Sequence, residues 1–264
     1  MYKIVSELGN GTFGRCFKVE KDNKFYVLKK INLRGLSEKD KKETLNEVKI
    51  LSQCNHFNII KYYESFIEKD YLNIITEYAE GGDLALKIKN QNNIPFSEDV
   101  LWNYLIQIAN GLKYLRDKRI LHRDIKPQNI YLDSEENIKI GDMGFGKLVT
   151  NNSLQKSVVG TPFYFSPELC NEQPYSFKSD IWAFGCLMYE LATFKPPFIA
   201  SNQIALAKKI CNEQPNPIPK FYSIELQFLI FKMLEKDVKK RPDINHILEY
   251  SAVKIRVIIF IKIL

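Results

Sequence analysis

Three side chains of complementary chemistry lie close together in the middle of the chain: Asp124, Lys126 and Asn129. The carboxylate of Asp124 can accept a proton from a hydroxyl group, and the ammonium group of Lys126 can neutralise charge that develops on a transferred phosphoryl group. The amide of Asn129 offers a neutral oxygen to a Mg²⁺ ion. A set of this kind could serve the transfer of a phosphoryl group to a hydroxyl.

A second carboxylate, Asp142, follows the strand-like residues 137–141. Mg²⁺ takes few protein oxygens and keeps several waters, so one amide oxygen and one carboxylate on opposite sides of a short loop are sufficient ligands. We therefore expect Asn129 and Asp142 to hold a Mg²⁺ ion.

A glycine-rich segment near the N-terminus has the spacing G-x-G-x-x-G at Gly9, Gly11 and Gly14. A backbone without Cβ atoms can lie close against phosphate oxygens. Residues 15–19 read as a strand rather than a helix, which argues against a dinucleotide-binding fold and for a glycine-rich hairpin. Taken alone, the motif also fits a glycine hairpin that binds no ligand.

Lys29 ends the apolar strand pattern of residues 25–28, from where its ammonium group can reach phosphates under the hairpin. Glu47, on the helix that follows, is the natural carboxylate to pair with Lys29 in a partly desolvated ion pair. For either residue alone, solvation at the surface is the default interpretation.

Two differently patterned parts must position these groups. The first part reads as strands separated by Gly, Asn and Asp, and one helix with a capping-box-like start at residues 37–40 interrupts them. After residues 80–83 the pattern becomes helical, most clearly at residues 100–115 behind Ser97 as a cap. The boundary is therefore expected near residues 77–82. The expected strands are residues 3–8, 15–19, 25–31, 59–66 and 71–76, and the further expected helices are residues 179–193, 203–211, 224–234 and 243–250.

The composition is that of an ordinary soluble protein, because 45% of the 264 residues are hydrophobic and 26% are charged. Disordered and fibrous proteins are excluded on this basis. The formal net charge of +7 is mild, and its Lys and Arg residues are spread along the chain. We therefore interpret them as a solvated face and expect no nucleic-acid partner.

The five cysteines are widely spaced without a C-x-x-C pair, which predicts neither a disulfide framework nor a zinc site and fits a reducing, cytoplasmic setting. No apolar core of a signal peptide follows Met1. The apolar run at residues 257–264 is far shorter than the roughly 20 residues of a membrane span. We expect a buried terminal segment or an artefactual chain end there, and no membrane partner.

Several motifs stand in the chain order of the eukaryotic protein kinase superfamily, which the sequence resembles over residues 3 to about 252. Residues 122–129 reproduce its H-R-D-x-x-x-x-N pattern, and residues 166–168 stand at its A-P-E position. Residues 180–185 match its D-x-W-x-x-G pattern, and Arg241 lies near its end. The resemblance implies an α+β, bilobal kinase fold, with a small, mostly antiparallel β-sheet N-lobe carrying one key helix and a larger, mostly helical C-lobe. Residues 1–76 would form the N-lobe, 77–82 the hinge, 83–252 the C-lobe and 253–264 an apolar tail.

The same resemblance implies ATP and Mg²⁺ as cofactors and a protein with a Ser or Thr acceptor as substrate. It also implies a buried ion pair between Glu168 and Arg241, and a structural role for Asp180 in supporting the catalytic loop. The implied catalytic residues are Asp124, Lys126, Asn129, Lys29 and Glu47, and the implied metal ligands are Asn129 and Asp142. The implied nucleotide-binding residues are Gly9, Asn10, Gly11, Gly14, Cys16, Val27, Lys29, Thr76, Glu77, Ala79 and Tyr131.

Three positions depart from the family pattern. Met143 replaces the Phe of D-F-G, and because Met is unbranched, apolar and adaptable, this exchange should cost about 1.5 kcal/mol or less. Cys16 replaces a Val, and Val27 replaces an Ala, so the surface that covers adenine differs in shape but stays apolar. We therefore expect catalysis to survive.

Within the superfamily, the sequence is most similar to the NIMA-related serine/threonine kinases. Lys126 and residues 160–162 resemble serine/threonine rather than tyrosine kinases, and residues 80–84, 160–170 and 193–198 carry the similarity to the NIMA-related group. That similarity implies cytoskeletal or ciliary work and substrates with an apolar residue upstream of the acceptor. Phe145 resembles kinases that prefer serine.

Ser157 is the predicted regulatory residue, because it lies four residues before Thr161, where family members carry an activating phosphorylation. A phosphate there would bring a charge of about −1.5 to −2, which Arg123 could bind and so order the loop. The alternative is an ordinary loop serine.

Two rival functions share the fold, a pseudokinase scaffold and a regulatory ATP-binding module that transfers nothing. Against both stand Lys29, Glu47, Asp124, Asn129 and Asp142, which are all present, and only Met143 favours them. NIMA-related proteins commonly extend into coiled coils, and since this chain shows no such segment we expect a mainly monomeric domain.

Overall fold

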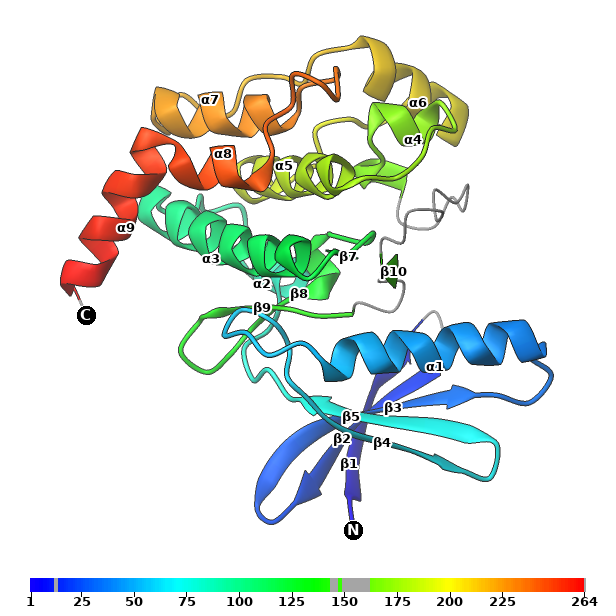
Figure 1. Ribbon diagram of the computed structural model, residues 1–264. Coiled ribbons are helices and arrows are strands. Elements are labelled where there is room, and N and C mark those ends of the chain that lie inside the picture. The colour runs from blue at the N-terminus through cyan, green and yellow to red at the C-terminus, as the bar shows by residue number, and fades with distance from the viewer. Residues whose placement is uncertain (12–13, 143–146, 149–161, 264) are drawn as a thin grey trace.

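The computed structural model describes residues 1–11, 14–142, 147–148 and 162–263 (Figure 1). The side chains at positions 10, 39, 43, 47, 147, 148 and 259–263 also lie outside the description. One lobe is built on a single antiparallel sheet and the other mainly from helices (Figure 1). This arrangement confirms the predicted α+β, bilobal fold.

The N-lobe sheet has five strands in the order β1-β2-β3-β5-β4, each antiparallel to its neighbours. Two tight turns close its hairpins, at Asp22 and Asn23 and at Lys69 and Asp70, and all four residues have positive φ. Asn and Asp tolerate this conformation, which two-residue hairpin turns require. The strands are β1 at Lys3–Gly11, β2 at Gly14–Lys21, β3 at Lys24–Asn32, β4 at Tyr62–Glu68 and β5 at Tyr71–Glu77.

Helix α1, at Glu38–Ser52, lies along this sheet on the side of the C-lobe (Figure 1). It begins as predicted, because the Ser37 hydroxyl accepts a hydrogen bond from the Asp40 amide. Val48 of α1 belongs to a buried cluster that includes Leu72 of the sheet. This packing fixes α1 against the sheet that carries Lys29.

The C-lobe is organised around α3, at Glu98–Asp117, and α5, at Phe177–Thr193. Ser97 caps α3 as predicted. Both Trp182 and Phe184 of α5 are fully buried, as expected of a helix that is apolar on nearly all sides and lies in the centre of a lobe. The other helices are α2 at Leu84–Asn90, α4 at Pro167–Cys170, α6 at Gln203–Asn212, α7 at Ile224–Met233, α8 at Ile244–Glu249 and α9 at Ser251–Ile263.

Short strands position the loops between α3 and α5. β6, β8 and β9 form one small sheet, and β7 pairs with β10. Because β8 pairs with β9, the chain before β8 and the chain after β9 lie side by side. The elements are β6 at Gly82–Asp83, β7 at Ile120–Leu121, the 3₁₀ turn η1 at Pro127–Asn129, β8 at Ile130–Leu132, β9 at Ile138–Ile140, β10 at Lys147–Leu148 and the 3₁₀ turn η2 at Pro162–Tyr164.

The apolar C-terminal run is helical, and the expectation of a buried segment holds only in part. Within this run, Val257 is partly buried against the C-lobe core, whereas Ile258 is 54% exposed. Arg256 ties α9 to α3, because its Nη1 lies 2.6 Å from Asp99 Oδ1. None of the described helices combines the length and the apolar character that a membrane span requires.

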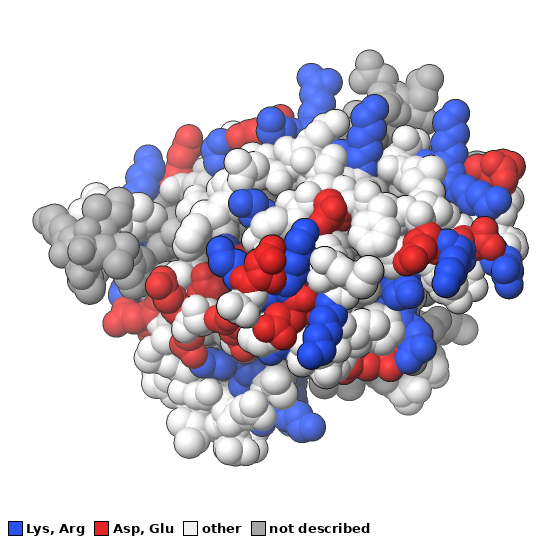
Figure 2. Space-filling model, turned by 90° about the horizontal axis from the view of Figure 1, so that it is seen from below, with Lys and Arg blue, Asp and Glu red and all other residues white. Residues whose placement is uncertain are grey.

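The face of the molecule at the bottom of Figure 1 carries charges of both signs. Lys and Arg side chains are interspersed there with Asp and Glu side chains (Figure 2). Alternating charges keep such a face solvated without creating a strong field of one sign.

Candidate active site

The loop between β7 and β8 brings the three residues of the central motif together. Lys126 Nζ lies 2.7 Å from Asp124 Oδ2. Asn129 Nδ2 donates hydrogen bonds to the carbonyl oxygen of Asp124, at 2.7 Å, and to its Oδ2, at 2.9 Å. Because the amide nitrogen is bound to Asp124, Oδ1 is the atom of Asn129 that can serve a cation. The predicted cluster of carboxylate, ammonium and amide is therefore present in three dimensions.

Asp180 of α5 holds the backbone of this loop. Asp180 Oδ2 accepts a hydrogen bond from the His122 amide and Oδ1 accepts one from the Arg123 amide, both at 3.0 Å. Arg123 has a φ of 73°, an uncommon conformation for a residue other than glycine. The predicted supporting role of Asp180 is therefore confirmed.

His122 connects this loop to the segment that carries Asp142. Its Nδ1 accepts a hydrogen bond from the Asp124 amide, so Nε2 is the nitrogen that donates to the carbonyl oxygen of Gly141, at 2.9 Å. The Gly141 amide in turn donates to the carbonyl oxygen of Asn129, at 2.9 Å. The two predicted metal ligands, Asn129 and Asp142, are thus carried by segments that are hydrogen-bonded to each other.

Lys29 of β3 reaches this segment from the N-lobe. Its Nζ lies 2.7 Å from Asp142 Oδ1, and the two side chains are 18% and 41% exposed. Burial raises the pKa of Asp142, but the charge and the hydrogen bond of Lys29 outweigh burial and hold that pKa below its ordinary value. Asp142 is therefore anionic at neutral pH. The predicted partner of Lys29, Glu47, belongs to α1, but its side chain lies outside the described residues.

Four of the predicted nucleotide-binding residues share one face of the N-lobe sheet. Cys16 lies opposite Lys29 in the strand register, Val27 lies opposite Thr76, and positions 27 and 29 of one strand face the same side. Burial raises the pKa of the Cys16 thiol, and the nearby charge of Lys29 opposes this rise. Cys16 is accordingly a protonated thiol at neutral pH.

Two glycines of the predicted hairpin, Gly9 and Gly14, are required for different structural reasons. Gly9 has a φ of +148° with open space where a Cβ would stand, so its conformation and not its surroundings favours glycine. A Cβ at Gly14 would lie 2.0 Å from the carbonyl oxygen of Lys30, which excludes any larger residue. Gly11 lies opposite Gly14 in the register, and the backbone of Asn10 belongs to β1.

Residues at the connection between the lobes complete the predicted set. The Glu77 carboxylate accepts a hydrogen bond from the Lys61 amide and lies 3.0 Å from Lys139 Nζ, so this side chain serves the protein and only its backbone could serve a nucleotide. Ala79 is buried. Burial raises the pKa of Tyr131, and the nearby carboxyl of Asp142 adds to this effect.

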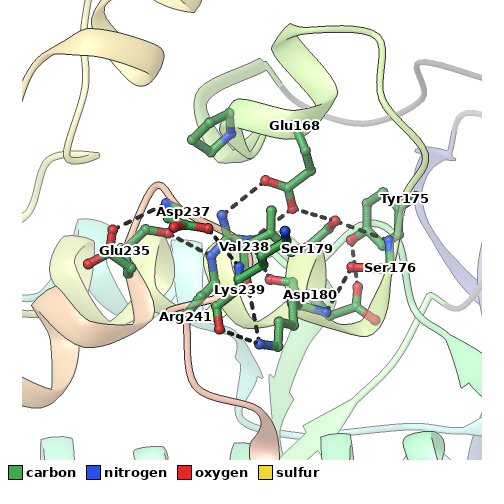
Figure 3. Close-up of polar contacts among 12 residues, drawn as sticks. Glu168, Tyr175, Ser176, Ser179, Asp180, Glu235, Asp237, Val238, Lys239 and Arg241 are labelled. Atoms are coloured by element: carbon green, nitrogen blue, oxygen red, sulfur yellow. Dashed lines mark hydrogen bonds and ion pairs between the residues drawn. The ribbon is translucent and has the colours of Figure 1, made fainter.

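A second ion pair is buried in the C-lobe, between Glu168 and Arg241 (Figure 3). Arg241 Nη1 and Nη2 donate to the two carboxylate oxygens of Glu168, at 2.8 and 2.9 Å. Ser179 donates to the same carboxylate at 2.7 Å, and Arg241 also donates to the carbonyl oxygens of Glu235 and Lys178. The predicted buried pair of Glu168 and Arg241 is confirmed.

One contact of this region was missed by the sequence interpretation. The Tyr175 hydroxyl donates to Asp180 Oδ1 at 2.6 Å (Figure 3). Its position five residues before Asp180 was the only signal. The regulatory candidate Ser157 lies outside the described residues, as do Met143, Phe145 and Thr161.

Comparison with known proteins identifies similar chains. The family model described as "Protein kinase domain" matches residues 2–252. The chain is 39% identical over 259 residues to the serine/threonine-protein kinase Nek1 of Mus musculus, covering 97% of this chain and 22% of that protein. It is 41% identical over 265 residues to the probable serine/threonine-protein kinase nek2 of Dictyostelium discoideum, covering 97% and 63%. It is 40% identical over 252 residues to the serine/threonine-protein kinase Nek5 of Homo sapiens, covering 94% and 36%. The chain therefore spans less than two thirds of the length of each of these relatives.

Proposed function

The chain belongs to the protein kinase domain family, and we propose that it transfers the γ-phosphoryl group of ATP to a serine or threonine hydroxyl of another protein. Its relatives confirm the predicted resemblance to the NIMA-related kinases and give no support to a pseudokinase. The observation that carries the proposal is the cluster of Asp124, Lys126 and Asn129, with Asp142 on the adjoining segment.

The residues at this cluster fit Mg²⁺ and the phosphates of ATP. Mg²⁺ prefers oxygen ligands, and the structure offers the anionic carboxylate of Asp142 and the Oδ1 atom of Asn129. A bound Mg²⁺ ion would neutralise charge on the phosphate oxygens. Lys29 would contact the phosphates from the sheet, with Glu47 as its carboxylate partner. The apolar side chains of Cys16 and Val27 would cover the adenine, and the small side chain of Thr76 would leave a pocket behind it open. The backbone of Glu77 and Ala79 would lie at its edge.

The chain's own side chains then have separable roles in the transfer. Asp124 would orient the acceptor hydroxyl and accept its proton, because its carboxylate is held by Asn129 and Lys126. Lys126, already beside Asp124, would neutralise charge on the phosphoryl group as it moves. The hydrogen bonds that the His122 and Arg123 amides donate to Asp180 would hold the loop backbone in position during this step.

The finer predictions belong to the same proposal. We infer an N-lobe at residues 1–76, a hinge at 77–82 and a C-lobe at 83–252, with ATP and a Ser/Thr protein as binding partners. Phosphorylation of Ser157 would order the segment between Asp142 and Glu168 through Arg123. The work of the protein would lie in the cytoplasm, at the cytoskeleton or the cilium, and this part of the protein would act as a monomer. The relatives are named serine/threonine-protein kinases, which supports the Ser/Thr acceptor, and the other inferences rest on the family resemblance of the sequence.

Transfer of ³²P from labelled Mg-ATP to casein and to the protein itself tests the proposal. Asp124→Asn should lower the rate about 10²- to 10⁴-fold, because it removes the proton acceptor. Asp117→Asn is the matched control, since Asp117 is an exposed carboxylate of α3 paired with Lys113, and it should transfer phosphate like wild type. If wild type and a Ser157→Glu variant both bind ATP and transfer nothing, the proposal is wrong and a scaffold is the better interpretation.

A further inference from the structure

Tyr175 contacts Asp180, the residue that holds the loop between β7 and β8. This loop carries Asp124 and is called the catalytic loop below; Tyr175 has no assigned role in it. It stands in the connection between α4 and α5, and its hydroxyl donates to Asp180 Oδ1 at 2.6 Å. Burial raises its pKa well above the ordinary value, so the hydroxyl stays a neutral donor at every pH at which the protein would work.

The Asp180 carboxylate is buried, so each of its donors matters. Its Oδ2 is bound by the His122 amide, and its Oδ1 is shared by the Arg123 amide and the Tyr175 hydroxyl. A buried carboxylate that loses a donor is free to rotate toward the remaining ones. Since Tyr175 and Arg123 share Oδ1, loss of the hydroxyl would disturb the atom that holds the Arg123 amide.

Arg123 needs this support because its backbone conformation is strained. A φ of 73° at a long side chain persists only where the surroundings impose it. The guanidinium carbon of Arg123 also lies 5.9 Å from the centre of the Tyr175 ring, within the range of a cation–π contact. Tyr175 thus acts on Arg123 in two ways. Its hydroxyl shares Asp180 Oδ1 with the Arg123 amide, and its ring contacts the Arg123 guanidinium directly. The next residue in the chain is Asp124.

We propose that Tyr175 is a positioning residue for the catalytic loop: its hydroxyl orients Asp180 and its ring supports Arg123, so that the Asp124 carboxylate is held where it can meet the acceptor hydroxyl. The inference rests on the proposed phosphoryl transfer. It assigns to Tyr175 no contact with ATP or with the substrate. Tyr175 should therefore affect the rate of the chemical step more than the binding of the nucleotide.

The variant Tyr175→Phe separates the two contacts, because it keeps the ring under Arg123 and removes only the hydroxyl. A displacement of the reacting groups by a fraction of an ångström is costly in rate, and we expect kcat to fall about tenfold while KM for ATP stays within about twofold of wild type. Tyr222→Phe is the matched control. It also removes one hydroxyl hydrogen bond, from Tyr222 to the carbonyl oxygen of Phe96, in a buried part of the C-lobe away from the catalytic loop.

Steady-state kinetics and thermal unfolding of both variants decide between positioning and mere stability. The proposal requires that kcat falls in Tyr175→Phe but not in Tyr222→Phe. It also requires that the two variants unfold at similar midpoint temperatures. An unchanged kcat in Tyr175→Phe, or an equal loss of kcat in Tyr222→Phe, would overturn it. A cycle with Asp180→Asn adds a further test, since Tyr175→Phe should have little additional effect when Asp180 is already changed.

Hydrogen exchange keeps the inference distinct from the proposed function. The His122 and Arg123 amides, which donate to Asp180, should exchange at least several-fold faster in Tyr175→Phe than in wild type, and should be unchanged in Tyr222→Phe. This measurement needs no catalytic activity. A wild type without phosphoryl transfer would contradict the proposed function alone, whereas unchanged exchange in Tyr175→Phe would contradict the role of Tyr175.

Discussion

Glu168 with Arg241 and Asp142 with Lys29 are two pairs of the same chemistry in different surroundings. The side chains of Arg241 and Glu168 are 0% and 4% exposed, whereas those of Lys29 and Asp142 are 18% and 41% exposed. Arg241 binds Glu168 through two nitrogens, and Ser179 donates a further hydrogen bond to the carboxylate. The first pair is saturated by protein groups, whereas the Asp142 side chain of the second pair remains partly open to solvent.

This difference separates a structural pair from a pair that is suited to a ligand. A buried pair recovers the cost of desolvation only when all its donors and acceptors are satisfied, and removing one partner then leaves an uncompensated charge. A partly exposed pair contributes little to stability, because water screens it. The Asp142 carboxylate can therefore exchange its cation partner at small cost, which a site for a metal ion requires.

Arg241→Ala should produce the largest effect, a loss of about 3–5 kcal/mol in the free energy of unfolding, because Glu168 would remain buried without its cation. Urea denaturation followed by circular dichroism measures this loss. Lys113→Ala, which breaks the exposed pair with Asp117, is the control and should cost about 0.5 kcal/mol or less. A loss below about 1 kcal/mol for Arg241→Ala would mean that the buried pair is not structurally essential.

Asp142→Asn should give the opposite result, with a large effect on catalysis and a small one on folding. We expect phosphoryl transfer to fall about 10²- to 10³-fold, since a charged group that acts on the reacting phosphates is removed. The free energy of unfolding should stay within about 1 kcal/mol of wild type, because the pair with Lys29 is partly exposed. Transfer assays and urea denaturation on the same preparation measure both. The comparison fails if Asp142→Asn destabilises the protein as strongly as Arg241→Ala.

The sequence predicted those parts of the site whose geometry is local. Asp124, Lys126 and Asn129 lie within one short loop, and the serine caps at Ser37 and Ser97 act on amides three residues away. Local spacing nearly determines such contacts. The pair of Glu168 and Arg241 is 73 residues apart in the chain, and only the family resemblance predicted it.

The contacts that the sequence did not predict depend on packing between distant elements. Tyr175 is one tyrosine among 14, and its position five residues before Asp180 does not by itself indicate that its hydroxyl binds that carboxylate. The apolar run of α9 was expected to be buried, but it is apolar on nearly all sides, so its pattern does not reveal which face packs on α3. Val257 packs against the core, and Ile258 remains exposed.

The smallest expected effect is the pH dependence of the stability that the buried pair of Glu168 and Arg241 provides. Burial raises the pKa of Glu168, but the hydrogen bonds and charge of Arg241, with the Ser179 hydrogen bond, outweigh burial and hold it below its ordinary value of 4.5. A carboxyl whose pKa is lower in the folded state binds fewer protons there than in the unfolded chain. Its contribution to stability is therefore complete above about pH 5.5 and is lost as the pH falls through 4.5 toward the folded-state pKa.

Glu168→Gln should accordingly cost about 2 kcal/mol at pH 7, and its difference from wild type should shrink as the pH falls from 5.5 to 3.5. Urea denaturation at a series of pH values measures the difference. Glu38→Gln changes an exposed carboxylate of α1 and should stay within about 0.5 kcal/mol of wild type throughout. A difference for Glu168→Gln that grows in acid would reverse the sign, and Arg241 would then not be the group that keeps Glu168 ionised inside the C-lobe.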